Sequence, residues 1–462
     1  MPKSRAKLVC GGCGFEAAAD ALLTFRCPRA KEGDDIDHII EVSLLGDCAG
    51  LGRDGIDRVD HIDSGVDADC EADDPNPFVR YRARSFAYAK AREFGMRDAD
   101  FVQLVRDLDT AVEASCGTGF RVTEWDTDAA FEEETSHPFG YKDETVGVAG
   151  SHKARHLFGL VILIEVAERV GLISPGKLGS PESPLAIASC GNAALAAAVL
   201  AHAWKRSLRV FIPADADPAV VSELERLGAQ IVTCPRTPDL PPGDPCVLAF
   251  RAAVASGAVP FTCQGPENGL VIDGGKTLGY ELAEAFEEGG TPDRLFIQVG
   301  GGALASATCQ ALEETLGLEG MPMIHAVQTT SCHPLATAFE ALLREIGDDS
   351  PSPDFFHEAR QHRSRYMRPV TTPVVSIATG ILDDETYDWF RVARAMLLTG
   401  GSPITVTEAQ LEDAREHAAP DADATGAAGL AGFLALLDQD ELELGESAGV
   451  LFTGIDRNPE KP

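Results

Sequence analysis

Short apolar runs alternate along this chain with longer segments in which apolar residues recur at helical spacing. Such runs are typical of buried strands, and the segments between them are typical of helices that connect parallel strands. We expect strands at 185–189, 208–212, 230–233, 295–299, 323–328 and 450–452. We expect helices at 193–204, 219–227 and 303–316. The alternation predicts an α/β protein with mostly parallel sheets.

The other segments lack this alternation. Apolar residues three or four positions apart predict helices within 76–115. Residues 119–124 have the composition of a short strand, whereas residues 125–143 are acidic and are expected to be irregular. The acidic, glycine-rich residues 51–75 predict a linker, and the polar residues 345–372 predict a long surface loop.

Charge narrows the range of functions. The chain of 462 residues carries a formal net charge of −34, which argues against binding of nucleic acids or anionic membranes. No apolar stretch reaches the roughly 18–20 residues of a membrane helix, and no apolar secretory signal is visible, so a cytoplasmic location is expected. The acidic composition is itself typical of adaptation to salt.

The 12 cysteines are scattered, which indicates reduced thiols rather than a disulfide framework. Three of them, Cys10, Cys13 and Cys27, have a spacing similar to part of a zinc ribbon. A ribbon needs a second Cys-x-x-Cys pair, but the residue three positions after Cys27 is alanine. His38 or Cys48 could complete a site. A ribbon that has lost its metal is the favoured interpretation, with the three cysteines as candidate ligands otherwise.

Lysine is scarce, with ten lysines among the 39 basic residues. One of them, Lys153, precedes the apolar run 157–163. An arginine would serve a solvated surface equally well, whereas a lysine amine can lose its proton and attack a carbonyl carbon to form a Schiff base. A lysine at a helix start is more often a solvated charge, so this prediction depends on the segments that follow.

A turn at 189–193 offers an anion site. It lies at the N-terminus of an alanine-rich helix, where unpaired N–H groups and the helix dipole favour a carboxylate. An ordinary helix cap made by Ser189 or Asn192 is the alternative.

A second turn contains Gly300, Gly301 and Gly302, followed by Ala303. Three glycines let the backbone approach a phosphate closely at a helix start. A dinucleotide site would need an acidic residue after the next strand, 323–328, which is followed by Thr-Thr-Ser instead. A lone phosphate is therefore favoured over a dinucleotide, and a tight packing turn is the alternative.

A hydroxyl, Thr453, follows the last strand, where alone it would be an ordinary β-branched residue. The amine of Lys153, the anion site, the glycine turn and this hydroxyl together need one ligand. That ligand must have an aldehyde, a ring oxygen, a phosphate and a ring nitrogen. Pyridoxal phosphate has all four.

In this order, the segments resemble the fold type II (tryptophan synthase β-like) pyridoxal-phosphate enzymes over about residues 140–457. Similar motifs are GSHKAR at 150–155 (Schiff-base segment), SCGN at 189–192, DGGKT at 273–277, GGGA at 300–303 (phosphate loop) and DATGAAGL at 423–430. The cysteine-containing N-terminal piece is most similar to threonine synthase. That family's Thr-Gly-His-Gly ending is replaced here by TGIDR at 453–457.

The resemblance implies a fold and a division of the chain. It implies two parallel-sheet α/β subdomains with the cofactor between them, plus a small N-terminal appendage. The expected parts are a small cysteine-containing β-rich segment at 1–50, an acidic linker and helical segment at 51–140, and the cofactor-binding catalytic core at 141–462. A homodimer is also implied.

The resemblance assigns roles to the residues as well. Lys153 would hold the cofactor and remove the α-proton of a small amino acid. Cofactor contacts are implied for Asn192, Gly300, Gly301, Gly302, Ala303 and Thr453. Substrate contacts are implied for Ser151, Ser189, Cys190, Gly191, Asn192 and Ala193. A neutral Thr453 opposite the ring nitrogen would favour elimination and replacement over transamination.

The implied activity is that of a pyridoxal-phosphate-dependent lyase similar to threonine synthase, which converts O-phosphohomoserine to threonine. A serine or threonine dehydratase (ammonia-lyase) and a β-replacement synthase are alternatives. A non-catalytic relative would be expected to lack the lysine or the glycine turn, and both are present. Arg155, His152 and Lys276 could assist a phosphorylated substrate, with structural roles as the alternative.

Overall fold

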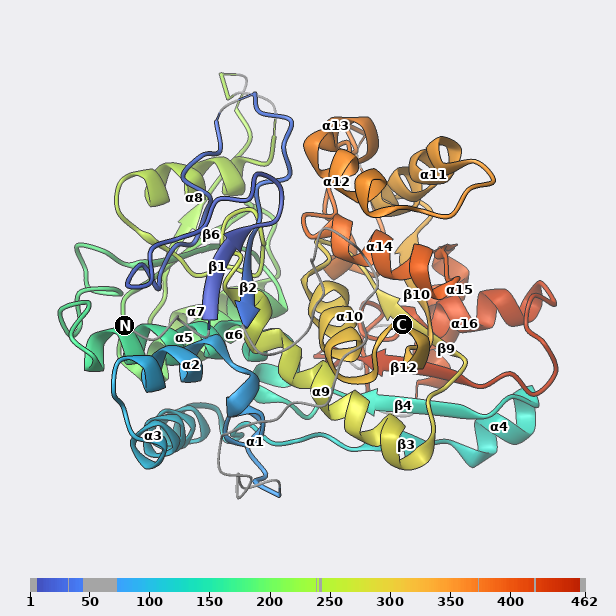
Figure 1. The fold of residues 1–462 in the computed structure, drawn as a ribbon, viewed down its shortest axis with the longest axis horizontal. Helices are drawn as coiled ribbons and strands as arrows, with labels where there is room; N and C mark the ends of the chain where they lie inside the picture. The colour runs from blue at the N-terminus through green and yellow to red at the C-terminus, as the bar shows by residue number, and fades with distance from the viewer. Residues whose placement is uncertain are drawn as a thin grey trace.

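The computed structural model describes residues 6–31, 33–44, 73–237, 239–240, 243–372, 374–418 and 421–457. It contains two largely parallel sheets with helices packed on them, in two halves that lie side by side (Figure 1). This confirms the predicted α/β fold class. The linker predicted at 51–75 lies outside the described residues except for its last three positions. No helix in the described parts of the chain is long and apolar enough to cross a membrane.

The first half is built on a four-stranded parallel sheet with the order β7-β6-β5-β8. Its strands are β5 (Leu185–Ala188), β6 (Leu208–Ile212), β7 (Gln230–Thr233) and β8 (Val259–Pro260). The first three lie where the apolar runs predict them. The helices of this half are α5 (Lys153–Arg169), α6 (Asn192–Trp204), α7 (Pro218–Arg226) and α8 (Pro245–Ala255).

The second half is built on a six-stranded sheet with the order β11-β10-β9-β12-β4-β3. Its strands are β3 (Trp125–Thr127), β4 (Phe139–Asp143), β9 (Arg294–Gln298), β10 (Met323–Thr329), β11 (Pro403–Val406) and β12 (Ala448–Phe452). All neighbouring pairs are parallel except β3 with β4. The carboxyl ends of five strands therefore meet at one edge, which is where ligands bind in such sheets.

Helices on this sheet complete the second half. They are α10 (Ala303–Leu316), α11 (Pro334–Ile346), α14 (Trp389–Thr399), α15 (Glu408–His417) and α16 (Ala428–Asp438). Helix α16 packs against β9, β10, β11 and β12, so its apolar face fills a core with the sheet. The helix at 303–316 begins and ends as predicted.

Helix α9 (Val271–Gly289) connects the two halves, because it packs on α5 of the first and on α10 of the second (Figure 1). The contact with α5 is made through Gly159 and Gly274. A Cβ atom at Gly159 would lie 2.6 Å from the Gly274 Cα, so a larger residue would push the helices apart.

Two predictions in the region 119–143 were wrong. Residues 119–124 form no strand, because the N–H of Phe120 donates to the Asp109 side chain instead of to a neighbouring strand. Residues 125–143 are not irregular, because they form β3, helix α4 (Ala129–Thr135) and β4. The buried Lys142 interrupts the apolar pattern of β4, and its amine forms an ion pair with Glu281 at 2.8 Å.

The prediction of a long surface loop at 345–372 was also wrong in part. This region contains α12 (Pro353–Gln361) and the short α13 (Arg363–Tyr366). The polar composition reflects contacts with the N-terminal segment: Arg360 is buried and forms an ion pair with Glu41.

The N-terminal part of the chain packs on both halves. Strands β1 (Ala6–Cys10) and β2 (Ile40–Leu44) form an antiparallel pair. The predicted helices within 76–115 are confirmed as α1 (Pro77–Arg80), α2 (Phe86–Glu93) and α3 (Asp98–Cys116).

Candidate active site

Two of the predicted site segments, the one that contains Lys153 and the one that contains Thr453, meet at the carboxyl edge of the six-stranded sheet. Phe452, the last residue of β12, pairs with Asp143, the last residue of β4. Just beyond these strand ends, Ser151 forms a β-bridge with Gly454. The N–H of Ile455 donates to the Gly150 carbonyl at 2.9 Å. These pairings bring the segment before α5 next to the end of β12.

Lys153 is the first residue of α5 and is half-buried. In the described part of the chain, no hydrogen bond or ion pair holds its amine. Two imidazoles flank it. Burial lowers the pKa of His152 well below its usual value and the pKa of His156 to about 3, and the charge of Lys153 adds to both shifts. Both rings are therefore neutral near pH 7.

Polar atoms without partners lie beside this lysine. The Ser151 side chain and the His152 ring are both buried. Neither the Ser151 Oγ nor the His152 Nε2 has a hydrogen-bond partner among the described residues. A buried polar atom without a partner is costly, and a ligand that binds there can supply one.

The hydroxyl at the end of β12 is oriented by a glutamine from β9. The Gln298 Nε2 lies 2.9 Å from the carbonyl oxygens of Gly426 and Leu451 and 2.5 Å from the Thr453 Oγ1. Carbonyl oxygens only accept hydrogen bonds, so this end of Gln298 must be its amide nitrogen. The Thr453 hydroxyl therefore accepts from Gln298, and its own proton points to another acceptor.

The predicted anion site at the start of α6 has no ordinary cap. Gly191 occupies the N-cap position, and no side chain of the described residues caps this helix. The alternative of a Ser189 or Asn192 cap was therefore wrong. Ser189 Oγ accepts only a long, 3.4 Å hydrogen bond from the Gly191 N–H, and Cys190 is exposed. The first-turn amides, including that of Ala193, are thus available to a carboxylate.

Arg457 lies next to this helix start, which the sequence alone did not predict. Its Nη1 donates to the Asn192 Oδ1 and its Nη2 to the Ala149 carbonyl oxygen, both at 2.5 Å. The only sequence signal was its position four residues after Thr453. The guanidinium adds a positive charge beside the α6 amides.

The glycine turn lies between β9 and α10 and is covered by a segment that precedes α14. Gly302 has φ +91°, a conformation that favours glycine. A Cβ at Gly300 would lie 2.5 Å from the Asp383 carboxylate, and one at Gly302 would lie 2.9 Å from Thr386. The Asp383 carboxylate therefore lies directly against the predicted phosphate loop.

Two carboxyl groups of this covering segment, Asp383 and Asp388, are close enough to feel the charge of Lys153, and the sequence pattern gave no signal for them. Asp388 is buried and Asp383 is half-buried. Desolvation raises the pKa of Asp383 to about 6 and the pKa of Asp388 to about 7, while the charge of Lys153 opposes both shifts. The Asp388 carboxylate also accepts a 3.2 Å hydrogen bond from the Gly265 N–H. Both groups change protonation near neutral pH.

Other basic residues near the site are already paired. Arg155 donates to Glu144 and Glu281 at 2.7 and 2.6 Å, and its side chain is 5% exposed. Lys276 pairs with Glu314 at 2.6 Å. The ion pairs of Arg155 and Lys276 support the structural alternative for both residues.

Comparison with known proteins identifies the family of this chain. The family model described as "PALP: Pyridoxal-phosphate dependent enzyme" matches residues 121–454 of this chain. The chain belongs to this family. Its cofactor is pyridoxal 5′-phosphate, as predicted. No curated protein matches the chain.

Solved structures of low sequence identity share the fold. Maize serine racemase has 16% identity and a TM-score of 0.55, with 77% of this chain and 94% of that chain covered. The processed form of threonine deaminase isoform 2 from Solanum lycopersicum has 14% identity and a TM-score of 0.54, with 79% and 91% covered. Diaminopropionate ammonia lyase from Escherichia coli has 15% identity and a TM-score of 0.55, with 77% and 88% covered.

The described residues fit this cofactor on chemical grounds. The Lys153 amine has no partner, the Thr453 hydroxyl has a proton to donate, and the Ser151 and His152 atoms lack partners. The glycine turn has the close backbone approach that a phosphate needs. The Asp383 carboxylate lies against this turn and would repel a phosphate there.

Proposed function

We propose that this member of the family is a lyase of small amino acids that is similar to threonine synthase and acts on O-phosphohomoserine. In this proposal, Lys153 holds the cofactor and moves the α-proton. The start of α6 binds the substrate carboxylate, and the glycine turn binds the cofactor phosphate.

The observation that carries the elimination chemistry is the Thr453 hydroxyl at the end of β12. Gln298 donates to it, so the hydroxyl can donate its proton to a ring nitrogen. A neutral donor does not stabilise a protonated ring as an aspartate would. A ring without that proton favours elimination or replacement over transamination.

The residues around Lys153 suit proton transfer. When bound, pyridoxal phosphate withdraws electrons from the substrate Cα, which is the cofactor's own contribution. The Lys153 amine accepts the proton from Cα and returns it later in the reaction. Neutral His152 and His156 add no positive charge that would repel a protonated Lys153.

Arg457 supports a phosphorylated substrate. It lies beside Asn192, at the start of the helix that would hold the substrate carboxylate. A guanidinium binds phosphate oxygens through two parallel hydrogen bonds. We therefore assign the substrate phosphate to Arg457.

A second candidate is an ammonia-lyase that acts on serine or threonine. Arg155 and Lys276 are two cations that could have bound a substrate phosphate, but both already form ion pairs with glutamates. Solved structures with this fold include a threonine deaminase and a fungal L-serine ammonia-lyase from Rhizomucor miehei. A substrate without phosphate would need neither cation.

The first experiment tests the lysine. Purified protein should absorb visible light, and borohydride should bleach this band and fix the label on the peptide that contains Lys153. A label on another lysine would refute the proposed site. A protein that takes up no pyridoxal phosphate would refute the activity.

The second experiment separates the two substrates. We expect faster turnover of O-phosphohomoserine than of serine or threonine. The substitution Arg457→Gln should lower kcat/KM for O-phosphohomoserine by at least about 10-fold, because charged hydrogen bonds contribute roughly 1.5–3 kcal/mol. Faster turnover of serine or threonine, unaffected by Arg457→Gln, would favour the ammonia-lyase.

A further inference from the structure

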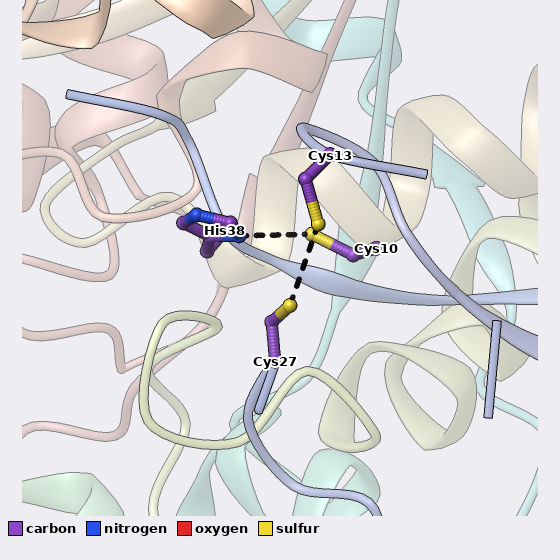
Figure 2. A group of neighbouring side chains, drawn as sticks. All are labelled: Cys10, Cys13, Cys27 and His38. Carbon is purple, nitrogen blue, oxygen red and sulfur yellow. Dashed lines mark hydrogen bonds between the residues drawn. The ribbon is translucent and has the colours of Figure 1, made fainter. Parts of the chain in front are cut away.

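Four side chains of the N-terminal segment lie far apart in the sequence but come together in space. Cys10 lies at the end of β1, Cys13 in the turn that follows, Cys27 in the next loop and His38 just before β2. Figure 2 shows three sulfur atoms and one imidazole pointing at a common centre. Their ligand atoms all lie within 4.8 Å of one another. Cys48, the other residue considered as a ligand, lies outside the described residues.

The distances match those of a tetrahedral metal site. Zinc bonds of about 2.3 Å to sulfur and 2.0 Å to nitrogen place two sulfurs about 3.8 Å apart, and a sulfur and a nitrogen about 3.5 Å apart. The Cys13 and Cys27 sulfurs are 3.6 Å apart. The Cys10 sulfur and the His38 Nδ1 are 3.4 Å apart.

The surroundings are also those of a metal centre. The His38 Nε2 lies 3.0 Å from the Asp34 carboxylate, which fixes the ring so that Nδ1 faces the three sulfurs. Gly14, at φ +66°, allows the turn in which its N–H donates to the Cys10 carbonyl at 2.9 Å.

We propose that Cys10, Cys13, Cys27 and His38 bind one Zn²⁺ ion. Three thiolates and one imidazole are a ligand set that zinc prefers, and four protein ligands leave no open position for a substrate. The site is therefore structural. His38 takes the place of the fourth cysteine whose absence made loss of the metal the favoured interpretation from sequence.

The ion would stabilise a segment that contacts both halves of the molecule. On one side, the Gly269 N–H, just before α9, donates to the Phe25 carbonyl at 3.1 Å. On the other, the Asp37 N–H donates to the Arg360 carbonyl of α12 at 2.8 Å. Both contacts lie within three residues of a proposed ligand. Loss of zinc should therefore weaken the N-terminal contacts of both halves.

Metal analysis of the purified full chain tests this proposal. We expect one zinc per chain. Cobalt(II) bound in its place should give thiolate charge-transfer bands in the near ultraviolet and tetrahedral bands in the red. The red bands lie away from cofactor absorption. The substitution Cys13→Ser should abolish these signals, whereas Cys116→Ser, a half-buried cysteine on α3, should keep them.

Two further variants use the histidine. His38→Cys should retain zinc, since four thiolates also form a tetrahedral site, whereas His38→Ala should lose it. Asp34→Asn should weaken zinc binding roughly 10- to 100-fold, as measured by competition with a coloured chelator. If a cysteine variant fails to fold, competition with the same chelator still measures zinc binding by the wild-type chain.

Three results would overturn the proposal. The first is wild-type protein that binds no zinc when reduced and supplied with the ion. The second is zinc that survives Cys13→Ser. The third is a Cys13–Cys27 disulfide, found by non-reducing peptide mapping of protein made in a reducing cell, which would show a redox pair instead.

Discussion

Lys153 and Arg155 lie two residues apart in the first turn of α5, yet their surroundings differ sharply. The Arg155 guanidinium donates to two buried carboxylates, Glu144 and Glu281. The Lys153 amine is held by no ion pair or hydrogen bond among the described residues. One cation is part of a closed network, and the other is available to a ligand.

This difference distinguishes a structural ion-pair network around Arg155 from a ligand-binding site around Lys153. Burial alone would raise the pKa of Glu281, but the charges of Arg155 and Lys142 hold it below its usual value, so the network stays ionised. Thr123 also joins it, through a 2.7 Å hydrogen bond from its hydroxyl to Glu144. Around Lys153, by contrast, Ser151 and His152 keep buried atoms without partners. A ligand can bind there without breaking existing pairs.

The largest expected effect is that of Lys153→Ala. We expect the rate of the lyase reaction to fall by at least about 1,000-fold, because the amine that moves the proton is lost. The midpoint of thermal unfolding should change little, since the amine has no partner to lose. Steady-state kinetics and thermal unfolding measure the two effects.

Lys153→Arg is the matched control because it keeps the charge without a nucleophile. It should be as inactive as the alanine variant, and borohydride should fix no label in either. Substantial activity in Lys153→Arg would show that charge, not the amine, is what matters at this position.

The next largest expected effect is a loss of stability when the ion-pair network of Arg155 is broken. Arg155→Met leaves the buried Glu144 without a cation and Glu281 with Lys142 alone, which we expect to cost about 3–5 kcal/mol in the free energy of unfolding. Urea denaturation measures it. Arg97→Met, which removes an exposed ion pair with Asp100, should cost less than about 1 kcal/mol. Equal effects would mean that the network does not have the structural role described above.

Thr453→Val tests whether the hydroxyl beside the lysine acts on the ligand. We expect kcat to fall roughly 10- to 100-fold, because the ring nitrogen would lose its hydrogen-bond donor, whereas Gln298 keeps its two carbonyl acceptors. Thr453→Ser keeps the hydroxyl and should retain most of the activity. A valine variant as active as the serine variant would remove Thr453 from the reaction.

The predicted site residues at 189–193, 300–303 and 453 could be placed from sequence because they follow predicted strands. Once the apolar runs fix where β5, β9 and β12 end, the residues after them must lie at the same edges of parallel sheets. The strand β4 was missed because its Lys142 is buried with Glu281, a partner 139 positions away. Local pattern carries no signal for such a pair.

Asp383 and Asp388 were missed for a related reason. They belong to a polar segment with no periodicity, and their importance comes from lying against the glycine turn, about 80 positions earlier in the chain. His38 was one of two alternatives for the metal group. The ring is placed beside the cysteines by the pairing of β1 with β2, which brings Ile40 opposite Cys10.

The smallest expected effect concerns Asp383, an acidic residue against the glycine turn. Its carboxylate lies against this turn and would repel a phosphate. Asp383→Asn should therefore strengthen binding of pyridoxal phosphate about 10-fold, or roughly 1.4 kcal/mol. Fluorescence titration of the apoprotein measures it, and Asp384→Asn, which removes the neighbouring charge, should have less effect.

The advantage of the asparagine variant should depend on pH. Burial raises the pKa of Asp383 to about 6, so the carboxylate is charged at pH 7.5 and mostly protonated at pH 5.5. Repulsion of the phosphate is then present above about pH 6 and lost below it. The affinity ratio of Asp383→Asn to wild type should fall from about 10 towards 1 as pH falls. The phosphate also loses negative charge as pH falls through this range, which lowers the repulsion in the same direction. A ratio that does not change with pH would mean that the Asp383 carboxylate does not face the bound phosphate.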